Sequence, residues 1–155
     1  MAYNSSNILE ALENDYREGK LEVLNHDIAY YIDEKTDQIR DILDERLELA
    51  DFKAHPSETQ LEIALKEAIL HSRILNPGTD AEAQLAEIER HIWILGEKYR
   101  QPPDREQEAL DWVRKFASSW REYRLLAILY VFEKNREQYI QRLKNTGAFD
   151  DILEQ

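Results

Sequence analysis

Residues Leu125 to Phe132 form an unbroken apolar run, Leu-Leu-Ala-Ile-Leu-Tyr-Val-Phe, in a chain that is otherwise strongly polar. A helix of this composition is hydrophobic on every side, so other helices, a second subunit or a partner must surround it. The chain has 155 residues, of which 43% are hydrophobic. A chain of this length can bury about 68–70% of the surface that its unfolded form exposes. We therefore expect a hydrophobic core organised around this segment.

The spacing of the other apolar residues predicts helices throughout, because the alternation typical of strands is missing. We expect one all-α domain over residues 1–155, a bundle of about five helices with a long C-terminal helix as its central or interfacial element. The expected helices cover about residues 7–18, 20–54, 57–75, 79–100 and 104–146. A bend is expected at 33–37 and a break near Ser118 and Ser119. Residues 148–155 form either a frayed tail or a short docked turn.

The sequence Asn76-Pro77-Gly78 separates the third expected helix from the fourth. Thr79 and Glu82 match a capping box for the fourth helix, and Asp104 is the expected cap of the last helix. Helices joined by so short a connection usually pack antiparallel. The third and fourth helices are therefore predicted to form an antiparallel hairpin.

The chain contains no cysteine. This excludes disulfides, thiol nucleophiles, zinc-thiolate sites and iron-sulfur clusters, and it is compatible with a reducing compartment. The N-terminal residues do not resemble a signal peptide, and no apolar run reaches the length that spans a bilayer. We expect a cytoplasmic protein that has no cofactor and does not bind membranes.

The net charge of −12 lies mostly in the first third of the chain. Residues 1–50 carry 13 acidic and 5 basic side chains, whereas residues 104–155 carry 10 and 9. Direct binding of nucleic acid is disfavoured, because no excess of cations is available to displace counterions from phosphates. A partner attracted by this charge should be basic.

A series of carboxylates recurs at intervals of three and four residues, which keeps them on one face of the second expected helix. Neighbouring like charges destabilise a helix slightly unless a basic surface covers them. One interpretation is that this acidic ladder imitates the phosphates of a nucleic acid and binds a basic protein. The alternative is an outer face that only confers solubility. The acidic ladder consists of Asp33, Asp37, Asp41, Asp44, Glu48 and Asp51.

Aromatic residues are concentrated in the last expected helix. Trp112 falls on the side opposite Val113, which we assign to the core side of that helix. Tyr123 and Tyr130 lie seven residues apart, and basic residues neighbour Tyr123. Trp, Tyr and Arg are the residues that most often dominate binding energies at protein interfaces. Trp112, Tyr123 and Tyr130 are therefore candidates for partner binding, with burial in the core as the alternative.

Two acid-histidine couples, Glu67 with His71 and Glu87 with His91, have the i, i+4 spacing of one helix face. In an antiparallel hairpin of the third and fourth helices, these four side chains would lie nearly level and could hold a metal ion. The inward-facing Glu-x-x-His motif of four-helix di-iron proteins is absent. The simpler alternative is two ordinary surface pairs, each worth a few tenths of a kcal/mol.

No phosphate-binding glycine loop, nucleophile elbow or His-Glu-x-x-His motif occurs. We therefore expect a non-catalytic acidic protein that acts through protein-protein interaction, as an adaptor, a chaperone-like protein or an inhibitor. Its partner should present a basic or apolar surface. A homo-oligomer would also bury the apolar helix. The alternatives are a nucleic-acid mimic that inhibits a basic DNA- or RNA-binding protein, and a metal-binding bundle using the two acid-histidine couples.

Overall fold

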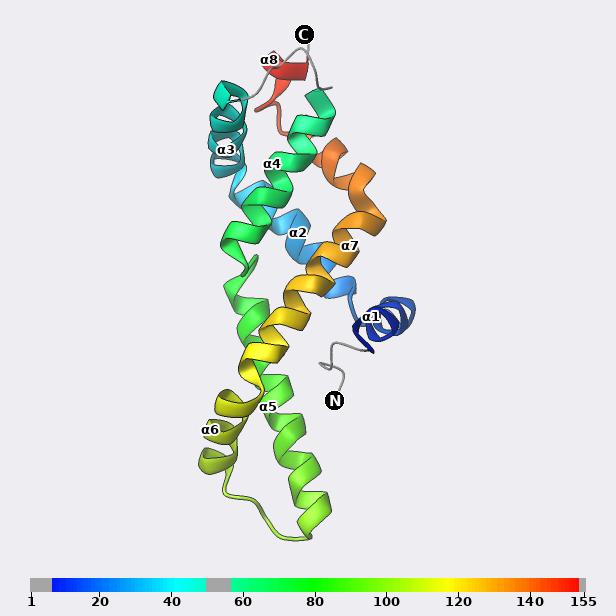
Figure 1. The fold of residues 1–155 in the computed structure, drawn as a ribbon, viewed down its shortest axis with the longest axis vertical. Coiled ribbons are helices and arrows are strands. Elements are labelled where there is room, and N and C mark those ends of the chain that lie inside the picture. The colour runs from blue at the N-terminus through cyan, green and yellow to red at the C-terminus, as the bar shows by residue number, and fades with distance from the viewer. Residues whose placement is uncertain (1–6, 50–56, 154–155) are drawn as a thin grey trace.

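The computed structural model describes residues 7–49 and 57–153, and within these ranges every regular element is a helix. The all-α prediction is confirmed. The molecule is elongated, with helices packed together at one end and a helical hairpin projecting at the other (Figure 1). The helices are α1 (Ile8–Arg17), α2 (Glu22–Glu34), α3 (Thr36–Leu49), α4 (Ser57–Ser72), α5 (Pro77–Tyr99), α6 (Arg105–Lys115), α7 (Ala117–Asn145) and α8 (Asp150–Leu153).

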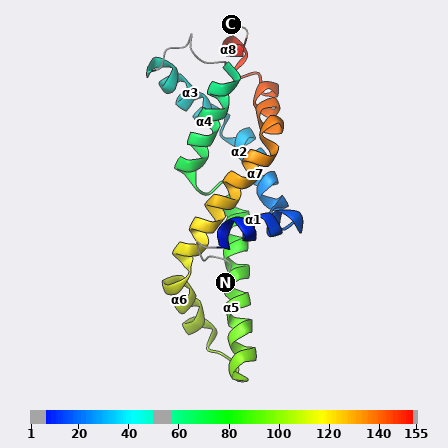
Figure 2. The same ribbon diagram turned by 45° about the vertical axis from the view of Figure 1, so that its right-hand side comes forward.

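Helix α7 is the central element of the fold, as expected from its apolar run. It packs against α2 and α4 and also contacts α1 and α6 (Figures 1 and 2). Ala127, Ile128, Val131 and Phe132 are buried, while Leu126 is exposed. The neighbouring helices thus cover one side of the apolar segment and leave Leu126 on the surface.

Each of the two longest expected helices is divided. The bend predicted at 33–37 is a complete break at Lys35, after which the hydroxyl of Thr36 donates to the carbonyl of Ile32 at 2.6 Å. The break predicted near Ser118 lies instead at Phe116, which separates α6 from α7. Within α7 the side chain of Asn135 donates to the carbonyl of Val131 at 3.0 Å. A side chain that takes a backbone acceptor in this way accounts for the non-helical angles at Asn135.

The predicted hairpin of the third and fourth helices is wrong. Helices α4 and α5 follow one another end to end; α4 packs against α3 and α7, whereas α5 pairs with α6 (Figure 1). The reason is that α3 and α7 bury the apolar face of α4, including Leu61, Leu65 and Ala68, completely. Helix α5 must find its partner further along the chain.

The N-cap of α5 is Asn76, and not the expected Thr79. The side chain of Asn76 accepts hydrogen bonds from the backbone N–H groups of Gly78 at 3.1 Å and Thr79 at 3.4 Å. Pro77 then occupies the first turn, where its missing N–H is tolerated. The hydroxyl of Thr79 instead donates to the Asp27 carboxylate and lies 3.2 Å from the carbonyl of Asn76. At the next helix start the prediction holds, since Asp104 accepts from the backbone N–H of Gln107 at 3.2 Å.

The C-terminal segment through residue 153 docks on the other helices. Phe149 and Ile152 are buried in the main core. Arg40 in α3 donates to both carboxylate oxygens of Asp151, at 2.7 and 2.8 Å, and to the carbonyl of Ala148 at 3.0 Å. One arginine thus fixes α8 from the side while its apolar residues fill the core.

Helices α5 and α6 form a projection, called here the arm, and the remaining helices form the body. Among the described residues, the main core cluster draws side chains from the body and none from α5 or α6. Both views show the arm extending away from the rest of the molecule (Figures 1 and 2). The arm must therefore be held by contacts of its own.

Candidate functional site

The arm exposes large apolar side chains to an unusual degree. Trp93 is 66% exposed, Tyr99 60% and Leu85 58%. Isolated exposed apolar residues are normal, but several on one element mark an interaction surface. Six of the thirteen exposed large apolar side chains in the described part of the chain lie on the arm: Leu85, Trp93, Ile94, Tyr99, Leu110 and Val113.

Trp112 of α6 packs against α7 and lines a small cavity together with His91 and Ile94 of α5. It is fully buried, and its ring meets Trp120 edge to face at a centroid distance of 6.0 Å. The expectation that Val113 faces the core while Trp112 points away is wrong, because Leu110 and Val113 are both exposed. Only four of the eleven residues of this helix are apolar, Ala109, Leu110, Trp112 and Val113, and their spacing does not choose between the two faces. Burying the much larger tryptophan removes more apolar surface from water and decides the orientation.

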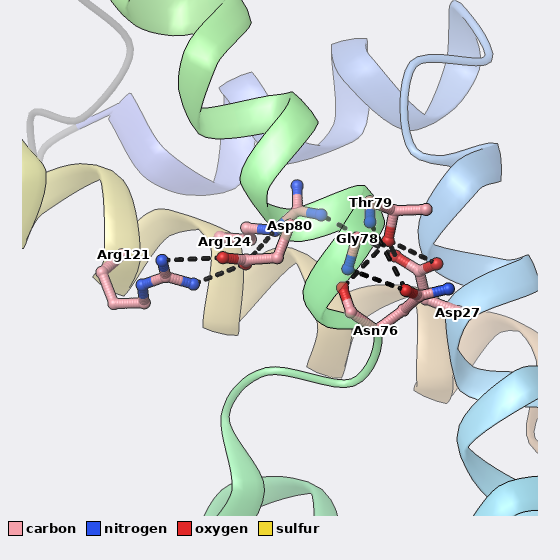
Figure 3. Close-up of polar contacts among 7 residues, drawn as sticks. All are labelled: Asp27, Asn76, Gly78, Thr79, Asp80, Arg121 and Arg124. Atoms are coloured by element: carbon pink, nitrogen blue, oxygen red, sulfur yellow. Dashed lines mark hydrogen bonds and ion pairs between the residues drawn. The ribbon is translucent and has the colours of Figure 1, made fainter.

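The base of the arm is fixed by a buried ionic cluster on the first turn of α5 (Figure 3). The Asp80 carboxylate accepts two hydrogen bonds from Arg121, at 2.5 and 2.9 Å. Arg124 donates to the same carboxylate at 3.1 Å. Both arginines belong to α7, so the cluster ties the arm directly to the central helix. Paired, hydrogen-bonded charges of this kind are the form in which buried ions are tolerated.

Asp27 completes the cluster from α2. It accepts hydrogen bonds from the Thr79 hydroxyl at 2.8 and 2.9 Å, and Arg124 lies 3.7 Å away. Burial raises the pKa of the Asp27 carboxyl, although the Thr79 hydrogen bond and Arg124 act in the opposite direction. Two carboxylates and two guanidinium groups from three helices therefore meet at the junction of arm and body (Figure 3).

The same arginines also pack on an aromatic ring. The guanidinium carbons of Arg121 and Arg124 lie 4.8 and 5.4 Å from the ring centroid of Trp120. Trp120 is itself buried against Trp112. The aromatic packing between α6 and α7 and the ionic cluster at the base of the arm are thus continuous. This arrangement holds the exposed surface of the arm in a defined position relative to the body.

Sequence reasoning did not find this cluster. Asp27 and Thr79 are 52 residues apart, and Asp80 and Arg121 are 41 apart. Each residue taken singly looks like an ordinary charge on an amphipathic helix. The one available signal is that Asp27 falls between Leu24 and Ile28 on the buried face of its helix, where an unpaired carboxylate would be costly.

The acidic ladder does not lie on one continuous helix. The break at Lys35 places Asp33 on α2 and leaves Asp37, Asp41, Asp44 and Glu48 on α3. All five are exposed, but Asp33 is paired with Arg142 at 2.9 Å and Asp44 with Arg40 at 2.9 Å. Asp51 lies outside the described residues.

The aromatic candidates are mostly covered. Trp112 belongs to the interior of the arm. Tyr123 is buried on α7, where its hydroxyl donates to the carboxylate of Asp15; burial, followed by this contact, raises the pKa of the phenol. Tyr130 is half-buried and meets Tyr16 edge to face at 5.7 Å. Trp112 and Tyr123 therefore contribute little to an exposed surface, and the most exposed aromatic residues in the described part of the chain are Trp93 and Tyr99.

The two acid-histidine couples lie on helices that do not pack side by side. Glu67 accepts a hydrogen bond from Arg46 at 3.1 Å, and His71 is exposed. His91 lies inside the arm, 3.7 Å from Glu108, and its ring is tilted by 60° against that of Phe116 at a centroid distance of 5.4 Å. Among the described residues, no three acidic or histidine side chains gather as a metal site would require. Glu67, His71, Glu87 and His91 do not converge, because the hairpin that would bring them together does not form.

Within the described ranges, the structure offers no helix whose length and apolar content would suffice to cross a bilayer.

No known protein family, curated protein or solved structure matches this chain. The fold and the surface define this chain as an acidic all-α protein whose projecting arm exposes apolar residues.

Proposed function

We propose that this is a non-catalytic cytoplasmic protein that acts by binding another protein chain, and that the arm supplies the binding surface. The observation that carries the proposal is the exposure of Trp93 and Tyr99, at 66% and 60%, on a projection outside the main core. Large aromatic side chains contribute little to the stability of the free chain when they face water. At an interface they are among the strongest anchors.

The construction of the arm supports this proposal. A binding surface loses less free energy on association when it is already ordered in the free protein. Trp112 of the arm, packed on Trp120 of α7, and the four charged groups at the base order the arm without using the exposed aromatic residues. The exposed residues are therefore available to a partner while the scaffold stays in place.

A capture experiment tests the proposal. Tagged protein is incubated with native extract and with an untagged copy of itself, and bound proteins are identified after washes at low and high salt. The test variant is Trp93→Gln with Tyr99→Gln, which removes two exposed anchors and leaves the charge unchanged. The matched control is Leu9→Gln with Tyr30→Gln, two exposed apolar residues of the body. We expect binding that the control retains and the test variant loses; equal recovery by both variants contradicts the proposal.

A second candidate function rests on the acidic face of α3. Asp37, Asp41 and Glu48 are exposed and form no ion pair with a described residue, so they could contact a basic, nucleic-acid-binding protein. The observation is weaker than that for the arm, because arginines already neutralise Asp33 and Asp44. The double substitution Asp37→Asn with Asp41→Asn should abolish a salt-sensitive interaction if this face binds. Unchanged recovery of a basic partner rejects this candidate.

A further inference from the structure

We propose that the arm binds the arm of a second copy of this chain, in an antiparallel pair related by a two-fold axis near Gly96. The inference rests on the proposed function and names the occupant of the same surface. Four features support a second copy as the occupant: the charge of the arm, its unpaired ions, the arrangement of apolar residues about Gly96 and the length of α5.

The outer part of the arm is electrically neutral. Residues 89–115 carry six acidic and six basic side chains, so the other residues carry the whole net charge of −12. Two copies that met through their bodies would bring like charges together. Contact through the outer arms keeps the charged bodies apart and costs no net repulsion at the interface. A strongly basic or acidic partner gains no net attraction there.

Exposed charges of both signs are available for pairing between copies. Within the described residues, Lys98, Arg100 and Arg114 form no ion pair, and neither do Glu97 and Glu106. A surface that carries unpaired cations and anions together can be complementary to itself when a two-fold axis reverses one copy. Two copies of the same surface can then pair opposite charges and keep like charges apart.

Gly96 lies at the centre of the apolar face of α5. Trp93 and Tyr99 are three residues before and after it, which places them about 60° to either side on a helix of 3.6 residues per turn. In an antiparallel pair that crosses at Gly96, Trp93 of one copy faces Tyr99 of the other. A cavity of about 260 Å³ adjoins Gly96 and Trp93 and is closed on its other side by Pro103. It offers space for an aromatic ring of the second copy.

The chain's own packing does not require glycine at position 96. A Cβ atom there would meet Pro103 at 3.6 Å and the carbonyl of Gln101 at 3.9 Å, which are ordinary contacts. Glycine inside a helix costs about 0.5–1 kcal/mol relative to alanine. The glycine leaves open the space beside Pro103, which a side chain at position 96 would partly fill.

The elongated chain exposes more surface than a compact protein of the same mass. The chain exposes 9941 Å². A compact monomer of the same mass, 18.4 kDa, should expose about 8,200 Å². A stable dimer buries about 800 Å² on each partner. The 23 residues of α5 extend over about 35 Å, so a paired arm is long enough for such an interface.

The test is the mass of the intact chain in solution, measured by sedimentation equilibrium and light scattering over a range of concentrations. We expect twice 18.4 kDa for the wild-type chain, including at high salt. Trp93→Gln with Tyr99→Gln should weaken the dimer about a hundredfold, since two anchors are lost on each copy. Leu9→Gln with Tyr30→Gln should leave it unchanged. Gly96→Leu fills the cavity while favouring the helix, so it should give a folded monomer.

The position of the contact is tested separately with a thiol crosslinker, because the chain has no cysteine of its own. A single Glu97→Cys variant should be crosslinked as a dimer by a short reagent, and Glu13→Cys on α1 should not. A wild-type monomer at high concentration overturns the inference, as does a dimer that survives both arm variants or is lost in the body control. If the chain is monomeric and Trp93→Gln with Tyr99→Gln still abolishes capture of another protein, the proposed function stands and only the second copy is rejected.

Discussion

Arg121 in α7 holds Asp80 in the first turn of α5 through two hydrogen bonds, at 2.5 and 2.9 Å. The pair joins the arm to the central helix at the point where the chain leaves α4. Arg124 reaches the same carboxylate one turn further along α7. The position of the arm thus depends on one buried carboxylate shared by two arginines.

Removing the charge of Asp80 should be costly. Asp80→Asn leaves two guanidinium groups without their carboxylate in a largely buried place, which should lower the free energy of unfolding by about 3 kcal/mol. The matched control is Asp33→Asn, which breaks the exposed pair with Arg142 and should cost less than about 1 kcal/mol. Denaturant unfolding followed by circular dichroism measures both. Equal effects of the two substitutions would show that burial does not strengthen the cluster.

Removing the charge of the neighbouring Asp27 should have the opposite effect and stabilise the folded protein. Burial raises the pKa of its carboxyl above the ordinary value of 3.8, so the folded state binds a proton more tightly than the unfolded state. Ionisation therefore costs stability at neutral pH. Asp27→Asn keeps an acceptor for Thr79 and should raise the free energy of unfolding at pH 7.

The gain from Asp27→Asn should depend on pH in a defined direction. As pH falls toward 3.8, wild-type Asp27 becomes protonated in the folded state and the difference between variant and wild type shrinks. Unfolding of both proteins at pH 7 and at pH 4.5 measures this difference. A variant that is less stable than wild type at pH 7 would instead indicate that the ionised carboxylate is needed to hold Arg124.

Arg73 ends α4 in a left-handed conformation, with φ of 61°, and its N–H donates to the carbonyl of Ile69 at 2.9 Å. Glycine adopts this conformation without the steric cost of a Cβ. Arg73→Gly should therefore raise the free energy of unfolding by about 0.5–1 kcal/mol. Arg90→Gly, the same change inside α5, should lower it by a similar amount. Thermal unfolding of the two variants should shift in opposite directions, and a common direction would contradict this account.

The face of α6 that packs in the arm can be tested with two adjacent residues. Trp112 is fully buried and Val113 is 49% exposed. Trp112→Ala should cost about 3–5 kcal/mol or unfold the arm. Val113→Ala should change the free energy of unfolding by no more than about 0.5 kcal/mol. Hydrogen exchange in α5 and α6 locates the effect, and a larger loss for Val113→Ala would mean that the opposite face is buried.

Local patterns in the sequence predicted the features that depend on neighbours in the chain. The apolar run Leu125 to Phe132 predicted a central helix, and the charged residues after Ile32 predicted an interruption where Lys35 divides α2 from α3. Asp104 was predicted as a cap because its acceptor reaches an N–H three residues away. These interactions lie within one or two helical turns, so spacing alone reveals them.

Local patterns in the sequence did not predict which helices pack against each other. A short connection suggested that α4 and α5 form a hairpin, but the apolar face of α4 has two other partners, α3 and α7. The metal hypothesis for Glu67, His71, Glu87 and His91 depended on that hairpin and lost its geometric basis with it. In α6 the spacing of the apolar residues allows either the face of Trp112 or the face of Val113 to be buried. The packing against α5 and α7 decides between them.

The sequence by itself determined that the chain is helical, that α7 is its centre and that the acidity belongs to the first third, because these follow from composition and from contacts within a turn. The tertiary structure decided that α5 and α6 project as an arm and that Asp27, Asp80, Arg121 and Arg124 meet at its base. It also decided which aromatic residues remain exposed. Such contacts join residues tens of positions apart, and they are fixed by competition among helices for the same apolar faces, which no local spacing records.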